Sequence, residues 1–242
     1  MANLKHAIKQ GIVALKAKNI QPVMQTVGDE SLLKGKTALV VGGSGGIGKA
    51  VAKAFLKNGA NVVIAGTRRA KVDKVVLELG GNCAGVVVDL AEPDTFSKVI
   101  DEAVAFYGPI NILVNSAGVH TEDVSMGGFL DFSVEEYDRI LDINLRGVYF
   151  MVQSVAKRMI SDKVSNGHIL IVSSSAGNEP AWSPYRVSKW GLKGITEGMA
   201  SALVPHGIVV NAIAPGSTAT PLLGVEKGDS ISAEDNRLGR FA

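Results

Sequence analysis

From Lys36 onwards the chain alternates between short apolar runs and segments with helical periodicity. The apolar runs are typical of buried strands and occupy Lys36–Val41, Asn61–Gly66, Asn82–Leu90, Ile110–Asn115, His168–Ser174 and Gly207–Ala214. The helices expected between them are Lys49–Gly59, Arg69–Leu79, Glu92–Tyr107, Val134–Ile160 and Pro184–Val204. Because these strands are apolar throughout, both faces of their sheet must be covered. The pattern predicts an α/β fold, a doubly wound parallel sheet with helices on both faces.

The bulk composition excludes several classes of protein. A length of 242 residues, 46% of them hydrophobic and 20% charged, suits one large domain with a sizeable core. A net charge of +2 gives no indication of a nucleic-acid partner, and the four histidines lack metal-ligand spacing. No apolar run approaches the ~20 residues that span a bilayer. Cys83 is the only cysteine, so we expect a buried structural thiol and a cytoplasmic, reducing environment.

Residues 1–33 differ from the rest and are expected to form an N-terminal helical extension and linker ahead of a catalytic domain at residues 34–242. Leu4, Ile8, Ile12 and Leu15 fall on one helical stripe. An amphipathic helix of this kind packs on its own domain or on a neighbouring subunit. A targeting segment is the weaker alternative, because transit peptides favour Arg and Ser.

The glycine-rich segment Gly42–Gly48 leaves the first strand and opens the first helix. Backbone N–H groups and the helix dipole at such a point face a phosphate, and the glycines permit a tight turn. The spacing is not a strict G-x-G-x-x-G, and Gly48-Lys49-Ala50 excludes a P-loop. Because this turn lies between a clearly predicted strand and a clearly predicted helix, it predicts a pyrophosphate site.

The end of the second strand indicates which dinucleotide is preferred. An acid there would bond the ribose 2′-hydroxyl of NAD, whereas an arginine accommodates the 2′-phosphate of NADP. This strand is followed by Arg68 and Arg69, with no acid before Asp73. NADP(H) is therefore the predicted cofactor and NAD(H) the alternative, unless the two arginines merely solvate the start of a helix.

The stretch from Ser173 to Lys189 contains the candidate catalytic residues. Ser183 and Pro184 are typical of a helix N-cap and first position, and Tyr185 and Lys189 share one face of that helix. A phenol with a pKa near 10 is a poor acid or base at neutral pH, and a nearby ammonium lowers that pKa. We expect Ser174 to hold a carbonyl oxygen against the Tyr185 hydroxyl.

These motifs occur in the order in which the short-chain dehydrogenase/reductase family carries them. The ordered set is Gly42-x3-Gly46-x-Gly48, Asn115-Ser116-Ala117-Gly118, Asn144, Ser174, Tyr185-x3-Lys189 and Pro215-Gly216. The chain resembles this family over about Lys34 to Thr220. The resemblance implies a Rossmann-like fold that binds a nicotinamide cofactor at the carboxyl ends of its strands.

The resemblance also implies roles for individual residues. Tyr185 would be the general acid/base, while Lys189 would lower its pKa and bond the nicotinamide ribose. Asn144 would hold a water that passes the proton to Lys189. The other cofactor contacts that it implies are Gly42, Ser44, Gly46, Ile47, Gly48, Asp89, Leu90, Asn115, Ala117, Gly118, Pro215, Gly216, Thr218 and Thr220.

The chain departs from the family pattern in several places. Val41 replaces a usual Thr before the first glycine, and Ser116 replaces the second Asn of its motif. The interval from Ser174 to Tyr185 is shorter than is common. After about Asn236 the family continues with one further helix and a final strand, so we expect this sheet to lack that edge.

The predicted function is an NADP(H)-preferring oxidoreductase that interconverts a ketone and a secondary alcohol. The chain looks most like the branch containing 3-oxoacyl-[acyl-carrier-protein] reductases, with sugar, polyol and hydroxysteroid dehydrogenases as alternatives. A non-catalytic cofactor-binding or assembly protein is the alternative from another class. Residues 119–131 and 179–182 should shape the pocket for a small carbonyl or alcohol substrate.

Three further expectations concern packing. Trp182 is predicted to form the aromatic wall of the pocket, and Trp190 to pack in the core. The helices expected at Val134–Ile160 and Pro184–Val204 carry the subunit contacts of the family, which implies a homodimer or homotetramer.

Overall fold

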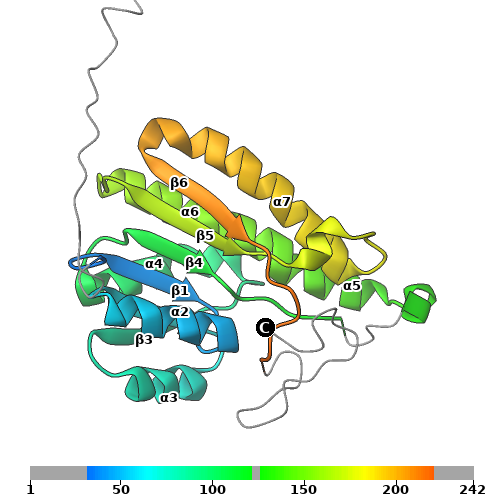
Figure 1. Ribbon diagram of the computed structural model, residues 1–242, viewed down its shortest axis with the longest axis horizontal. Coiled ribbons are helices and arrows are strands. Elements are labelled where there is room, and N and C mark those ends of the chain that lie inside the picture. Colours follow the sequence, from blue (N-terminus) through cyan, green and yellow to red (C-terminus); the bar gives the residue numbers. More distant parts are fainter. Residues whose placement is uncertain (1–31, 122–125, 221–242) are drawn as a thin grey trace, which may run out of the picture.

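A six-stranded parallel sheet forms the centre of the protein (Figure 1). The computed structural model describes residues 32–121 and 126–220. The strand order is β3-β2-β1-β4-β5-β6. The strands are β1 Thr37–Val41, β2 Asn61–Gly66, β3 Cys83–Val87, β4 Ile112–Asn115, β5 Gly167–Val172 and β6 Ile208–Ile213. The predicted Rossmann-like α/β fold is thereby confirmed.

Helices pack on both faces of the sheet. They are α2 Gly46–Lys57, α3 Arg69–Leu79, α4 Phe96–Tyr107, α5 Val134–Leu141, α6 Val148–Ser161 and α7 Pro184–Leu203. One buried cluster joins the sheet to α4, α6 and α7, and a second joins it to α2 and α3. The predicted boundaries agree closely with these bounds, because each strand and helix differs sharply in apolar pattern from its neighbours.

The helix expected from Val134 to Ile160 is interrupted. A π-helical segment, Asp142–Gly147, separates α5 from α6. At its end a Cβ on Gly147 would collide with the backbone carbonyl oxygen of Leu90. This close approach requires glycine at position 147, which lies at the end of the wider π-helical turn. A 3.6-residue periodicity cannot reveal such a segment, so predicting one uninterrupted helix was wrong.

Cys83 lies at the start of β3 and is 9% exposed. Burial raises the pKa of its thiol to about 11, so the thiolate form is disfavoured at neutral pH. The expectation of an inert structural cysteine is confirmed.

Some sequence expectations lie outside the described residues. They are the N-terminal extension as far as residue 31 and the absence of a sheet edge that was expected after about Asn236. Leu33, at the start of the described part, packs against the α2 side of the core. Within the described ranges, no helix is both long and apolar enough to cross a membrane.

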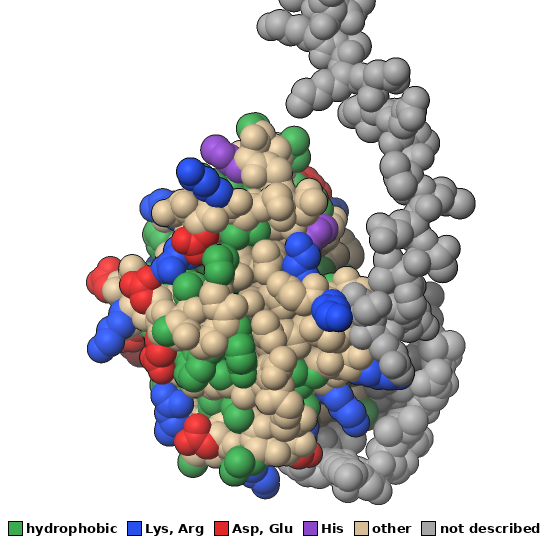
Figure 2. Space-filling model, turned by 90° about the vertical axis from the view of Figure 1, so that its left-hand side faces the viewer, with side chains coloured by type: hydrophobic (Ala, Val, Ile, Leu, Met, Phe, Trp, Pro, Cys, Tyr) green, Lys and Arg blue, Asp and Glu red, His purple; other side chains and the backbone are tan. Residues whose placement is uncertain are grey.

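Acidic and basic side chains lie interspersed on the side of the molecule seen in Figure 2. Several ion pairs connect side chains of opposite sign. Arg158 of α6, for example, pairs with Asp101 of α4 and with Asp162. Exposed pairs of this kind stabilise a protein by at most about 1 kcal/mol each, so the apolar clusters hold the fold together.

Phe96 tests the larger cluster, because it is fully buried at the start of α4. Phe96→Ala should lower the free energy of unfolding by about 3–5 kcal/mol through lost burial and an unfilled cavity. Phe106→Ala on the same helix is the matched control, since Phe106 is 47% exposed. Urea denaturation of both variants measures the difference, and equal losses would contradict this account of the core.

Candidate active site

The carboxyl ends of the central strands meet in register. Val41 of β1 pairs with Asn115 of β4, which pairs with Ile171 of β5. The residues that follow, from Gly42, Ser116 and Val172 onwards, therefore leave the sheet at one edge. Ser116 joins two of these ends, since its hydroxyl donates to the Val41 carbonyl at 2.8 Å.

The backbone of the glycine turn after β1 lies very close to neighbouring segments. Gly42 has φ +79°, and a Cβ there would lie 2.5 Å from the backbone nitrogen of Ala117. A Cβ on Gly48 would collide with the carbonyl oxygen of Gly42. The N-cap residue of α2, Gly45, provides no side-chain cap, so a phosphate oxygen fits as the acceptor for the first N–H groups of the helix.

A cleft of about 640 Å³ runs along this turn and the strand ends. Its lining includes most of the cofactor contacts expected from the sequence, namely Gly42, Ser44, Gly46, Ile47, Gly48, Arg68, Asp89, Leu90, Ala117, Gly118 and Thr220. A concave glycine-lined cleft beside an uncapped helix start fits a dinucleotide. One oxygen of Asp89 already accepts the N–H of Ala91 at 2.9 Å, which leaves the other for a ligand.

Arg68 and Arg69, which the sequence analysis treated together, have different environments. Arg68 lines the cleft with Lys71. Arg69 turns away, donating to the carbonyl of Gly85 at 3.2 Å and pairing with Asp73 at 3.5 Å. Of the two arginines, Arg68 alone lines the cleft. Sequence reasoning missed Lys71, although its position three residues along the helix from Arg68 could have indicated it.

A second cavity of about 240 Å³ adjoins the first and contains the expected catalytic residues. It is lined by Ser174, Tyr185 and Lys189, and by four residues of the segment after β6, Pro215, Gly216, Thr218 and Thr220. Ile47, Ala117, Gly118 and Thr220 line both cavities, so the two are continuous.

The start of α7 fixes the position of Tyr185. Ser183 accepts the N–H of Arg186 at 3.3 Å, and Pro184 occupies the first turn. The predicted N-cap and helix start are confirmed. The Ser183–Pro184 start sets the helix register, which brings Lys189 Nζ to 5.4 Å from the centroid of the Tyr185 ring.

The electrostatics of the pair differ from the sequence expectation. Burial raises the pKa of Tyr185, while a hydrogen bond with Ser174 and the charge of Arg186 act in the opposite direction. Burial also lowers the pKa of Lys189 to about 8, and its Nζ donates to the carbonyl of Val172 at 3.4 Å. The expected lowering of the Tyr185 pKa is wrong for the protein alone, because desolvation raises that pKa more strongly than Ser174 and Arg186 lower it.

Asn144 and Asn115 line neither cavity. The side chain of Asn144, fully buried in the π-helical segment, bonds both the N–H and the carbonyl of Val119 at 2.8 Å. It therefore clamps the loop after β4. Asn115 is 1% exposed, and neither of its side-chain polar atoms has a hydrogen-bond partner in the described structure.

Both tryptophan expectations were wrong. Trp182 does not line the cavity that contains Tyr185. It stacks on Phe132, with ring centroids 6.4 Å apart, and Arg186 lies over it at 5.3 Å. Trp190 is 47% exposed, since its indole N–H donates to the carbonyl of Glu179 on the protein surface.

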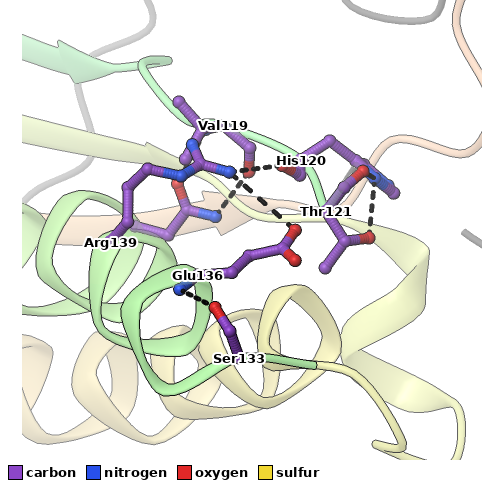
Figure 3. A network of polar contacts seen from close by, with 7 residues as sticks. Val119, His120, Thr121, Ser133, Glu136 and Arg139 are labelled. Carbon is purple, nitrogen blue, oxygen red and sulfur yellow. Dashed lines mark hydrogen bonds and ion pairs between the residues drawn. The ribbon is translucent and has the colours of Figure 1, made fainter. Parts of the chain in front are cut away.

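His120 lines the catalytic cavity. It belongs to the segment 119–131 that was expected to shape the pocket, but the sequence analysis gave it no individual role. Its ring centroid lies 4.1 Å from that of Tyr185. Figure 3 shows its loop connected to α5 through Arg139, which also pairs with Glu136 of that helix. Its place two residues after Gly118, a predicted cofactor contact, was the only available signal.

The family model for short chain dehydrogenase matches residues 36–229, which is most of the chain. The chain is a short-chain dehydrogenase/reductase. Oxidoreductase UcpA of Salmonella typhimurium is 36% identical over 210 residues, 84% of this chain and 75% of the relative. FabG of Thermotoga maritima, a 3-oxoacyl-[acyl-carrier-protein] reductase, is 34% identical over 86% of this chain and 85% of its own length.

Solved structures of the family share this fold. A 3-ketoacyl-(acyl-carrier-protein) reductase from Brucella melitensis, complexed with NADH, matches with TM-score 0.74 and 31% identity over 86% of this chain and 85% of its own. An actinorhodin polyketide ketoreductase variant with NADPH matches with TM-score 0.71 and 27% identity over 81% and 74%. Short-chain dehydrogenases of this fold are thus known with either cofactor.

The buried ammonium of Lys189 should lower the stability of this short-chain dehydrogenase at neutral pH. Below about pH 8 the folded and unfolded chains both carry this charge, and the folded chain must bury it. Between that pH and the ordinary lysine value of about 10.4, only the unfolded chain holds the proton, so stability rises with pH. In Lys189→Met this rise should be smaller.

Urea denaturation of the parent and Lys189→Met at pH 7 and pH 10 checks the prediction. The free energy of unfolding of the variant should exceed that of the parent most at pH 7, and this difference should shrink at pH 10. An equal difference at both values would show that Lys189 is not charged and buried as described.

Proposed function

We propose that this protein is an NADP(H)-preferring oxidoreductase that interconverts a ketone and a secondary alcohol. The observation that carries the proposal is the meeting of Ser174, Tyr185 and Lys189 in one cavity that is continuous with the glycine-lined cleft. A scaffold protein has no need of a buried lysine beside a tyrosine that hydrogen-bonds a serine.

Each of the three residues has a distinct proposed role. Ser174 and Tyr185 hold the substrate oxygen by hydrogen bonds, and Tyr185 donates or accepts the proton at that oxygen. The cofactor supplies or accepts the hydride. Lys189 stabilises the phenolate form of Tyr185, a role favoured once the remaining water is excluded from the cavity. Asn144 holds the backbone of Val119, which lines the glycine-lined cleft.

NADP(H) preference is supported by charge at the adenosine end of the cleft. Arg68 and Lys71 both line it, and Asp73, the nearest acid in the sequence, is paired with Arg69. A doubly charged 2′-phosphate is thus favoured over a ribose hydroxyl.

Among possible substrates, 3-oxoacyl thioesters rank first because FabG and the ketoacyl reductase are similar to this chain. Hydroxysteroids are the alternative, since a mycobacterial hydroxysteroid dehydrogenase is 34% identical over 192 residues.

Tyr185→Phe removes the proton donor and little else. We expect kcat to fall by about 10²–10⁴-fold in a ketone panel, with the Kd for NADPH nearly unchanged. Tyr137→Phe on α5 is the matched control, since Tyr137 is 41% exposed. Near-parent turnover by Tyr185→Phe would contradict the mechanism. NADPH binding without turnover of any substrate by the parent would favour a non-catalytic protein.

Arg68→Ala should reduce the preference for NADPH over NADH by about tenfold, because it removes a hydrogen bond to a charged group. Adding Lys71→Ala should reduce the preference further. Lys57→Ala, a basic exposed residue at the end of α2, controls for general charge. Fluorescence titrations with both cofactors measure the ratio, and equal affinities in the parent protein would contradict the assignment.

We further propose a homodimer formed through α6 and α7. Tyr149 and Phe150 of α6 are 41% and 38% exposed, and Cβ atoms added at Gly194 or Gly198 of α7 would meet no atom within 4 Å. This surface lets a second helix approach closely. Gly191 of the same helix is not part of this surface, because a Cβ there would meet the Leu145 side chain within the subunit.

Gly198→Arg should convert the dimer to a monomer by placing a charged side chain in the contact. Ala70→Arg, on the exposed surface of α3, is the control and should leave the assembly unchanged. Light scattering with size-exclusion chromatography gives the mass of each. A parent monomer, or a Gly198→Arg dimer, would contradict the proposed interface.

A further inference from the structure

The loop that follows β4 is held at three consecutive residues (Figure 3). Asn144 bonds both backbone groups of Val119 at 2.8 Å. Arg139 of α5 donates to the carbonyl of His120 at 3.4 Å, and Thr121 is 5% exposed. The backbone at His120 is therefore fixed relative to α5 and the π-helical segment.

The side chain of His120 contacts Tyr185. Their ring centroids are 4.1 Å apart and their planes are inclined by 31°, a tilted stack. Both residues line the catalytic cavity. The ammonium of Lys189 lies 5.4 Å from the centroid of the same phenol ring. Tyr185 is thus influenced by Ser174, its ring stacks on His120, and the ammonium of Lys189 lies over that ring.

The imidazole of His120 is held in its neutral form. Burial lowers its pKa, the carbonyl of Thr121 raises it, and the charges of Lys189 and Arg186 lower it further. Nδ1 lies 3.2 Å from both the carbonyl oxygen and the hydroxyl oxygen of Thr121, so either neutral tautomer has a hydrogen-bond partner there. A neutral ring stacks on the phenol without placing a second cation beside Lys189.

We propose that His120 is a positioning residue, which fixes the ring of Tyr185 in place for proton transfer. The inference rests on the proposed function. Ser174 restrains only the hydroxyl end of the phenol, whereas a misplacement of about 1 Å in a catalytic group costs up to about 100-fold in rate. The stacked ring of His120 restrains the rest of the Tyr185 side chain. Because this role needs an aromatic ring and not an imidazole nitrogen, phenylalanine should replace His120.

The kinetic test compares His120→Ala with His120→Phe. His120→Ala should lose about tenfold or more in kcat, with KM values and the melting temperature close to those of the parent. His120→Phe should keep most of the turnover. His206→Ala, an exposed histidine after α7, is the control. Full turnover by His120→Ala, or an equal loss in His120→Phe, would overturn the proposal.

Histidine NMR tests the stack without requiring turnover. The ring-proton signals of His120, assigned by their loss in His120→Phe, should be displaced by the phenol ring current. Tyr185→Phe should preserve that displacement and Tyr185→Leu should remove it. Identical spectra of both variants would overturn the proposal.

A parent that reduces no carbonyl compound contradicts the proposed function, whereas an active parent with an unaffected His120→Ala variant contradicts only the role of His120.

Discussion

The parallel pairing of β1, β4 and β5 is the constraint on which the rest of the structure depends. Their last residues lie side by side because the register aligns Val41, Asn115 and Ile171. Three loops far apart in the sequence therefore begin at one edge of the sheet. The glycine turn, the loop containing His120 and the serine segment therefore meet at that edge. The hydrogen bond from Ser116 to Val41 strengthens this edge.

Burial has opposite effects on the two central groups of this site. It disfavours the charged forms of both, lowering the pKa of Lys189 and raising that of Tyr185. The free protein therefore stores an unfavourable ammonium beside a neutral phenol. Phenolate formation during turnover would give that ammonium a partner, which is the physical reason to propose Lys189 as the group that stabilises it. The ion pair of Arg186 with Glu179 lies at the rim of the same cavity.

The fold could be predicted from the sequence because strands and helices differ in apolar period, and the glycine turn and Ser183–Pro184 mark two helix starts. The motif residues around Tyr185 could also be predicted from the sequence, since the order of these motifs along the chain is specific to the family. What the sequence could not provide depends on three-dimensional packing. The π-helical segment ends where Gly147 packs closely against Leu90, and the direction of the Tyr185 pKa shift depends on burial. Likewise, Trp190 looked like a core residue but bonds a surface carbonyl.

Transfer of a labelled hydride tests the central claim most directly. The protein is incubated with NADPH carrying deuterium at both C4 positions and a panel of 3-oxoacyl thioesters and other ketones, and the alcohol products are analysed by mass spectrometry and NMR. The account predicts one deuterium on the carbinol carbon for each NADPH consumed, and a rate of labelling about 10²–10⁴-fold lower with Tyr185→Phe. NADPH that binds but transfers no deuterium to any carbonyl compound would contradict it.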